Sequence, residues 1–354
     1  MSDHPPFLIY GSYGYTGQLT VRQAVERGLK PLLSGRDAAK VAAQAASFDL
    51  QARPFSLDDP AAAAQALSGI SAVLHCAGPF SATARPMLDA CLQTGAHYLD
   101  ITGEIAVFEA LAARDGEALA AGITVLPGAG FDVVPSDCLA AYLKSRLPTA
   151  RRLELAIRGL GGISQGTALT AVESLGQPSL VRRDGRIVPI PAGSHRRMVD
   201  FGRGPVEVVS VSWGDVSTAY YTTGIPNIED FMPFSGWLRQ IMPFTSWLKP
   251  APLRKLLAAA VRRFVQPPDD AQRERGLGLV WGQVTDAAGR QATARLRTPE
   301  PYTLTAMTAL AAVERVISGR CPPGFQTPAR ALGADFILEF PGCERTDLTT
   351  PQNQ

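Results

Sequence analysis

Short apolar runs alternate with alanine-rich helical patterns over the first 130 residues of the chain. Strands that alternate with helices in this way form a parallel, doubly wound sheet. We therefore expect an α/β, Rossmann-type sheet, with ligands bound beyond the carboxyl ends of its strands. The first predicted strand begins at Leu8, and the others lie at 31–35, 52–57, 71–78, 97–104 and 123–130. The first predicted helix follows the glycine turn and the second begins at Asp37. The later ones lie at 58–67, near 83–94 and in the stretch that ends at Ala121.

The pattern changes after Pro135, and the sequence there predicts a second, α+β domain on a mixed or antiparallel sheet. A long apolar helix at 302–318 is expected to return to the first domain. The predicted domains are residues 1–134, which bind NADP; residues 135–300, which include an apolar and basic segment at 225–268; and residues 301–354, a C-terminal helix and tail packed on the first domain. Within the second domain we expect a helix at 136–147, strands at 151–159, 206–213 and 218–224, and a hairpin of 276–286 with 291–298.

The first predicted strand leads into a turn with three glycines, in the motif YGSYGYTG. Glycine permits positive φ angles and a close approach of a ligand to the backbone, and the free N–H groups at a helix N-terminus attract an anion. This arrangement is typical of a dinucleotide pyrophosphate site, although the spacing is G-x-x-G-x-x-G and a plain glycine turn is the alternative. The expected cofactor contacts are Gly11, Tyr13, Gly14, Tyr15, Thr16 and Gly17.

The end of the second strand distinguishes NAD from NADP. NAD-binding sheets usually have an acidic residue there for the ribose hydroxyls, whereas a nearby arginine accommodates a 2′-phosphate. Here the strand ends in LLSGRD, which places Ser34 and Arg36 at the edge, with Asp37 able to cap the next helix. A guanidinium forms charge-assisted bonds to a phosphate, so NADP(H) is the expected cofactor.

The later strands end in residues that suit the nicotinamide side of such a site. The motif CAGPF ends the fourth predicted strand, and Cys76, Ala77, Gly78 and Pro79 are the expected cofactor neighbours there. The next two strands end in HYLDITGE and PGAGFDVVPSD, which carry acidic residues with either structural or functional roles. Asp137 is expected to belong to the first turn of a helix. The candidate proton donors are Asp132 first, then Asp100, with Tyr98 on the same face of its strand as Asp100, and Glu104.

Composition excludes several other classes of protein. A formal net charge of +2, with no basic stripe interleaved with aromatic residues, gives no nucleic-acid footprint. The five cysteines form no C-x-x-C pair, which favours free thiols in a reducing cytoplasm, and the N-terminal residues show no signal peptide. No zinc-spaced cluster is present, so no metal is expected, and none of the eight tyrosines begins the Tyr-x-x-x-Lys pair of short-chain dehydrogenases.

The segment 231–265 has an unusual composition, because it combines Phe, Trp, Met and Leu with six basic residues and no acidic one. Such a segment lies at a membrane surface or borders a lipophilic pocket. The alternative is a segment that packs on the core through its apolar residues and exposes its basic residues to solvent. We therefore expect a cytoplasmic protein, with peripheral membrane contact as one interpretation of this segment and oligomer formation left open.

Several motifs in order resemble the saccharopine dehydrogenase-like oxidoreductases, and within them the trans-acting enoyl reductases of mycobacterial lipid synthesis. The resemblance implies a Rossmann domain, a second α/β domain inserted before a returning C-terminal helix, and NADPH. It runs from Leu8 to about Phe340 and is carried by YGSYGYTG, SGRD, CAGPF, HYLDITGE, PGAGFDVVPSD, GGISQGTALT and GFQTPARALGADFI.

The function expected from the residues and the resemblance together is NADPH-dependent reduction of a lipophilic, enoyl-type substrate, free or carrier-bound. Hydride would reach the β-carbon and a proton donor would protonate the α-carbon. Two alternatives stay open: a non-catalytic NADP(H)-binding sensor, and a saccharopine-like amino-acid dehydrogenase in which Arg158, Arg182 and Arg183 bind substrate carboxylates.

Overall fold

The computed structural model describes residues 6–162, 164, 166, 168, 169, 172, 176–234, 236 and 251–348, and of residues 251–255 and 262 only the backbone. The chain divides into two compact units, Met1–Val134 with Tyr302–Leu332, and Pro135–Pro301 with Gly333–Gln354. No helix among the described residues is both long and apolar enough to cross a lipid bilayer. Most of the segment 231–265, including Trp237 and Trp247, lies outside the described residues, as does part of the region after Gly162.

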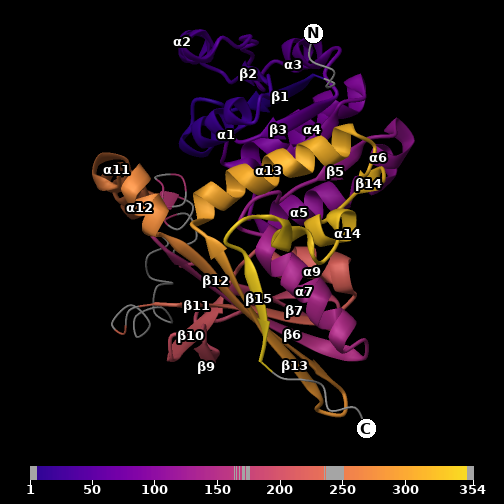
Figure 1. The fold of residues 1–354 in the computed structure, drawn as a ribbon, viewed down its shortest axis with the longest axis vertical. Coiled ribbons are helices and arrows are strands. Elements are labelled where there is room, and N and C mark those ends of the chain that lie inside the picture. The colour runs from indigo at the N-terminus through magenta and orange to yellow at the C-terminus, as the bar shows by residue number, and fades with distance from the viewer. Residues whose placement is uncertain are drawn as a thin grey trace. The chain divides into compact units, whose positions relative to one another are not determined.

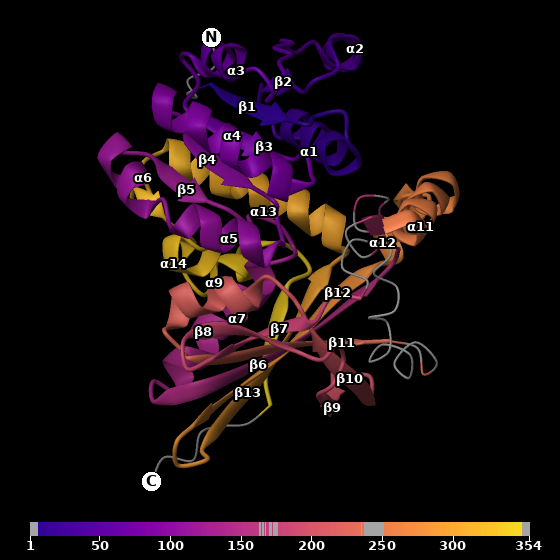
Figure 2. The same cartoon turned by 180° about the vertical axis from the view of Figure 1, so that it is seen from behind.

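The first unit is built on a parallel sheet of six strands in the order β14-β5-β4-β3-β1-β2. Its buried core contains strand residues together with residues of α1, α2 and α13, and α3 packs against α4. Figures 1 and 2 show α13 and α4 on opposite faces of the sheet. The predicted doubly wound fold, with a late helix that returns to it, is confirmed. Its elements are β1 (Phe7–Tyr10), α1 (Tyr15–Glu26), β2 (Leu32–Ser34), α2 (Ala38–Phe48), α3 (Pro60–Leu67), β3 (Ala72–His75), α4 (Phe80–Thr94), β4 (His97–Asp100), α5 (Ile105–Ala112), α6 (Asp115–Ala121), β5 (Thr124–Leu126), α13 (Pro301–Ile317), β14 (Gly324–Phe325) and α14 (Pro328–Leu332).

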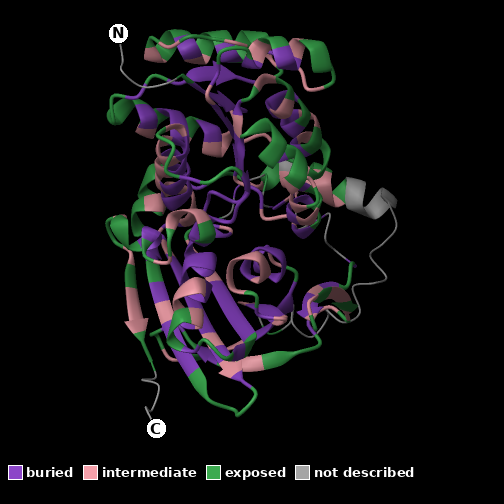
Figure 3. Ribbon diagram, turned by 90° about the vertical axis from the view of Figure 1, so that its right-hand side faces the viewer, coloured by how far each residue is buried: buried purple, intermediate pink, exposed green. Residues whose placement is uncertain are grey.

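The central strands are apolar on both faces because helices cover both sides of a parallel sheet. Leu8 and Ile9 are neighbours in β1 and are both fully buried, as are Val73 and Leu74 in β3. Figure 3 shows buried strand ribbons in the upper part of the view, together with helices that have exposed sides. The carboxyl ends of these parallel strands therefore meet at one edge of the sheet, which is where the candidate site lies.

One predicted strand of the first unit needs correction. The segment 52–57 is not a strand, because only an isolated bridge joins Ala52 to Leu33. The carbonyl of Arg53, the next acceptor along a parallel ladder, accepts instead from the Ser34 hydroxyl. The sixth strand of the sheet is instead the two-residue β14, which pairs in parallel with β5 after the chain returns through α13.

The second unit is built on a larger mixed sheet, in the order β15-β13-β12-β6-β11-β10-β9, with β7 joining β11 and β8. The pairing of β6 with β11 is parallel, and β12 and β13 form the predicted hairpin. Its elements are α7 (Val134–Arg146), β6 (Ala150–Leu160), β7 (Ser179–Arg183), β8 (Arg186–Ile190), β9 (Arg196–Asp200), β10 (Pro205–Val211), α9 (Asp215–Thr223), β11 (Asn227–Pro233), α11 (Ala251–Phe264), α12 (Asp270–Arg275), β12 (Leu277–Asp286), β13 (Gln291–Pro299), the 3₁₀ helix η2 (Phe336–Glu339) and β15 (Glu344–Asp347).

Two predictions for the second unit also differ from the structure. The segment 218–224 is not a strand but the end of α9, which Gly224 terminates in the left-handed conformation. The threonines and tyrosines of TAYYTTG are typical of strands, and they concealed the helical spacing of the buried Val216 and Ala219. The tail does not pack entirely with α13, because β15 pairs antiparallel with the edge strand β13 and residues from Gly333 onward belong to the second unit.

Candidate active site

The turn between β1 and α1 is tightly folded, and glycine is required for it. Gly11 has a φ of +81°, and a Cβ there would lie 2.8 Å from the Cβ of Ala77. A Cβ on Gly17 would lie 2.2 Å from the carbonyl oxygen of Gly11. The backbone of the turn therefore contacts both the first turn of α1 and the loop after β3, as a cradle for a pyrophosphate requires.

The N-terminus of α1 presents its amides without a side-chain cap. Its N-cap is Gly14, and no side chain accepts a hydrogen bond at this position. The first amides of a helix have no intrahelical acceptor and carry the positive end of the helix dipole. Tyr13, Gly14, Tyr15 and Thr16 are all partly exposed, so a phosphate can reach this helix end.

The end of β2 separates the roles of the residues predicted there. Ser34 is fully buried, its hydroxyl donates to the carbonyl of Arg53 at 2.6 Å, and its own carbonyl accepts from the amides of Gly11 and Ser12. Ser34 thus holds the glycine turn in place and does not present its side chain to a ligand. Arg36 is exposed and forms no ion pair among the described residues, so its guanidinium is available to a 2′-phosphate.

Asp37 caps α2, as one interpretation of the sequence suggested. Its carboxylate accepts from the amide of Lys40 at 3.1 Å, and this bond lowers the pKa of Asp37. The carboxylate is thereby committed to the helix end, while the guanidinium of the preceding residue stays free.

The loop after β3 is fixed by the partly buried Thr83 and the buried His75. The hydroxyl of Thr83 donates to the carbonyls of Ala77 and Pro79, at 2.8 and 3.0 Å, so Nε2 of His75 must donate to that hydroxyl, 2.9 Å away. Burial lowers the pKa of His75 to about 3, which keeps the ring neutral. Burial likewise raises the pKa of Cys76 to about 12 and makes its thiol unreactive. Ala77, Gly78 and Pro79 form the part of this loop that a ligand can touch through the backbone.

Glu104 closes the N-terminus of α4. Its two carboxylate oxygens accept from the amides of Phe80 and Ser81, at 2.9 and 3.0 Å. A carboxylate at this position satisfies two orphan amides and interacts favourably with the helix dipole. The role of Glu104 is thus to anchor α4 and the loop before it, which makes it a poor proton donor.

Tyr98 and Asp100 point to the same side of β4, as predicted, and are joined by a hydrogen bond. The Tyr98 hydroxyl donates to Oδ2 of Asp100 at 2.6 Å, and Oδ1 accepts from the amides of Thr102 and Gly128. Burial raises the pKa of Asp100 to about 6. Both side chains are fully buried, so they brace the turn after β5 and are not exposed to a substrate.

Asp132 occupies the position that suits a proton donor best. It is partly exposed, and burial of its carboxyl raises its pKa to about 6. Oδ2 of Asp132 lies 3.0 Å from the position that a Cβ on Gly103 would occupy. Gly103 directly precedes Glu104, which caps α4. The carboxyl therefore lies beside the turn after β4, at the same sheet edge as the glycine turn.

Comparison with known proteins agrees with this geometry. Residues 7–126 match the family model of the saccharopine dehydrogenase NADP binding domain. This segment of the chain is thus similar to saccharopine dehydrogenase NADP binding domains. The expected resemblance is thereby confirmed, and so is NADP(H) as the cofactor.

The curated relatives match about half of this chain. The saccharopine dehydrogenase-like oxidoreductase of Homo sapiens is 25% identical over 210 residues, which are 51% of this chain and 49% of that protein. A trans-acting enoyl reductase of Mycobacterium leprae (strain TN) is 28% identical over 156 residues, 42% of this chain and 37% of that protein. These matches thus span half or less of either relative.

The overall fold has a solved counterpart. Apo saccharopine dehydrogenase (L-Glu forming) from Saccharomyces cerevisiae superposes with a TM-score of 0.67 over 98% of this chain and 100% of that one, at 12% identity. At this identity the likeness concerns the fold alone.

Three residues of the NADP-binding unit were missed from the sequence. The Thr305 hydroxyl accepts from the amide of Phe131 at 2.9 Å, and the Thr308 hydroxyl donates to the carbonyl of Ala129 at 2.8 Å. Both lie on α13, and Tyr302 at the start of the same helix contacts the ring of Tyr15, with centroids 5.0 Å apart. The helical spacing of the two threonines was visible in the sequence, but their partners lie more than 170 residues away.

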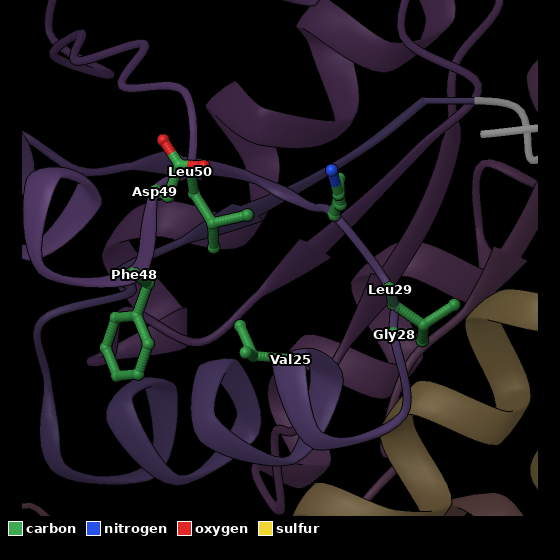
Figure 4. Close-up of a pocket in the computed structure, with 7 residues that line it drawn as sticks. Val25, Gly28, Leu29, Phe48, Asp49 and Leu50 are labelled. Carbon is green, nitrogen blue, oxygen red and sulfur yellow. The ribbon is translucent and has the colours of Figure 1, made fainter. Parts of the chain in front are cut away.

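One pocket of the NADP-binding unit lies away from this site. It has a volume of about 110 Å³ and is lined by Val25, Gly28, Leu29, Lys30, Phe48, Asp49 and Leu50 (Figure 4). These residues follow the ends of α1 and α2, which run back from the carboxyl edge of the strands. The pocket is therefore at the opposite edge of the sheet from Asp132 and takes no part in the site.

Proposed function

We propose that the chain is an NADPH-dependent reductase of a lipophilic, unsaturated, enoyl-type substrate. The observation that carries the proposal is the position of Asp132: this partly exposed residue lies at the same sheet edge as the uncapped N-terminus of α1, and burial of its carboxyl raises its pKa to about 6. A general acid works best when its pKa lies near the working pH. An NADP-binding edge with such a group has the two components that a reduction with protonation needs.

The cofactor-binding residues divide the dinucleotide among three elements. The first amides of α1 bind the pyrophosphate, and the guanidinium of Arg36 pairs with the 2′-phosphate. The backbone of Ala77, Gly78 and Pro79, held by Thr83, orients the nicotinamide end. When bound, NADPH supplies a hydride.

Asp132 then supplies the proton. In an enoyl substrate the β-carbon becomes the hydride acceptor, and the electron pair of the double bond moves to the α-carbon. The protonated carboxyl of Asp132 donates to that carbon and becomes a carboxylate, which solvent reprotonates. Because the donor must carry its proton, activity should fall as the pH rises through about 6.

The substrate class rests on the relatives and on composition. Trans-acting enoyl reductases are among the curated relatives, at 28% identity. The segment 231–265 is rich in Phe, Trp, Met and Leu, which suits an acyl chain better than an amino acid. Saccharopine-like substrates and a non-catalytic sensor become outcomes of the test.

The test measures NADPH oxidation with enoyl thioesters of increasing chain length, with saccharopine in parallel. We expect turnover of the long enoyl thioesters, and we expect Asp132→Asn to lower kcat by about 10²–10⁴-fold, the usual contribution of a general acid, with little change in NADPH affinity. The fall in kcat above pH 6 should disappear in the variant.

The matched control for this substitution is Asp49→Asn. Asp49 is exposed at the C-terminal end of α2, in a left-handed conformation that asparagine also adopts. It should retain full activity. NADPH binding without turnover of any enoyl thioester would favour the sensor, turnover of saccharopine would favour the amino-acid dehydrogenase, and full turnover in Asp132→Asn would assign the proton to another group.

A further inference from the structure

Helix α11 exposes more apolar surface than a helix of a folded domain normally does. Phe264 is 78% exposed and Leu256 is 67% exposed, the two highest values for large apolar side chains among the described residues. Leu257, Ala260 and Val261 on the same helix are also only partly buried. None of the helix side chains that the structure describes is buried, so packing against the described residues does not account for this apolar face.

The apolar residues of α11 form one stripe. Leu256, Leu257, Ala260, Val261 and Phe264 recur at spacings of three and four, which places them on one side of a helix with 3.6 residues per turn. Arg263 falls at the margin of that stripe. The helix is thus amphipathic over its described side chains, with a cationic residue at the margin of the apolar stripe.

Charge identifies the kind of surface that such a helix fits. No acidic residue occurs between Asp230 and Asp269, whereas this stretch has six basic ones, four of them on α11. Long basic side chains at the margin of an apolar stripe extend their charged ends toward phosphate headgroups while their stems stay in apolar surroundings. A protein groove would need acidic rims to match, and an anionic bilayer offers this complement along the whole helix.

We propose that α11 is a docking surface for an anionic lipid bilayer. The helix has 14 residues, which corresponds to about 21 Å at 1.5 Å per residue and is too short for a hydrocarbon core of about 30 Å. It therefore lies in the plane of the interface, with Leu256 and Phe264 inserted among the acyl chains and the basic residues at the headgroups. Attachment of this kind is peripheral and reversible, and it is weakened by salt.

The experiment is co-sedimentation of the full chain with vesicles of phosphatidylcholine alone or of an equal mixture of phosphatidylcholine and phosphatidylglycerol. We expect binding to the anionic vesicles in low salt, release in high salt, and little binding to the zwitterionic ones. Phe264→Gln should weaken binding roughly 10–100-fold, because a buried aromatic side chain is lost. Arg263→Gln should weaken it about fivefold, the contribution of one basic residue near an anionic surface.

Leu119→Gln provides the matched control, since Leu119 is 52% exposed on α6 of the first unit and should leave binding unchanged. Phe264→Trp provides a gain of signal: its fluorescence should shift to the blue with anionic vesicles, whereas that of Leu119→Trp should not. Equal binding of wild type and Phe264→Gln, no sedimentation with anionic vesicles in low salt, or salt-resistant self-association in place of binding would each overturn the proposal. The assay contains neither NADPH nor substrate, so its outcome does not depend on the proposed reduction.

Discussion

Helices α1 and α4 begin at the same edge of the same sheet, directly after the paired parallel strands β1 and β3, yet their N-termini differ. The N-terminus of α1 is preceded by Gly14 and has no side-chain cap. The N-terminus of α4 is filled by the Glu104 carboxylate, which accepts from its first two amides. One carboxylate is enough to neutralise the partial charge that would attract a phosphate. Of two equivalent helix ends, α1 is therefore left for the cofactor, and α4 is used to hold the loop that flanks it.

Closing the turn before α1 should have the largest effect. In Gly17→Ala the new Cβ would lie 2.2 Å from the Gly11 carbonyl and 2.8 Å from that of Ser12. Both are backbone atoms, so the turn itself must move, at a cost at the upper end of the range for overpacking, about 3 kcal/mol or more. We expect NADPH affinity to fall by about 100-fold or more, measured by fluorescence titration.

The control for this variant is Gly116→Ala in α6, where a Cβ would meet no atom within 4 Å. It should bind NADPH normally and gain up to about 1 kcal/mol of stability, because alanine favours a helix more than glycine does. Wild-type affinity in Gly17→Ala would show that the tight turn is only a structural feature of the strand-to-helix connection.

A smaller effect is expected when the glycine turn before α1 is kept and the residue proposed to bind the 2′-phosphate is changed. Arg36→Ala should weaken NADPH binding by about 1.5–3 kcal/mol, the range for hydrogen bonds to charged groups, and leave NADH binding unchanged. Arg320→Ala removes an exposed arginine elsewhere in the same unit and should affect neither cofactor. Equal losses for NADPH and NADH would remove Arg36 from the 2′-phosphate site.

The contrast between the two helices also shows what the sequence could predict. The glycine turn, the helix after it and the strand ends are local patterns, so the α/β class and the position of the cofactor edge followed from periodicity and spacing. The shared face of Tyr98 and Asp100 followed from the two-residue repeat of a strand, whereas the hydrogen bond between them came from the structure.

Pairings over longer distances could not be predicted in this way. Glu104 was an even choice between roles because its partners, the amides of Phe80 and Ser81, lie more than 20 residues earlier. Ser34 looked like a cofactor contact because a strand end gives no indication that its hydroxyl turns inward to Arg53. The strand predicted at 52–57 and the strand found at Gly324–Phe325 have the same explanation. Whether a segment joins a sheet depends on its neighbouring strand, which the local sequence does not identify.

The smallest effect is expected from opening α4. Glu104→Ala removes the cap from the amides of Phe80 and Ser81 and should cost about 0.5–2 kcal/mol of stability, the range for loss of an N-cap residue. Glu104→Gln keeps one acceptor oxygen and should lose less. The exposed amides of the alanine variant then resemble those of α1, so inorganic phosphate should raise its thermal midpoint more than that of the wild-type chain, because a ligand that binds only the folded state stabilises it. Thermal melts with and without phosphate measure both effects. If the midpoint of Glu104→Ala equals that of the wild type and phosphate adds nothing to the difference, Glu104 is not what distinguishes α4 from α1, and the preference of the cofactor for α1 must come from the glycine turn alone.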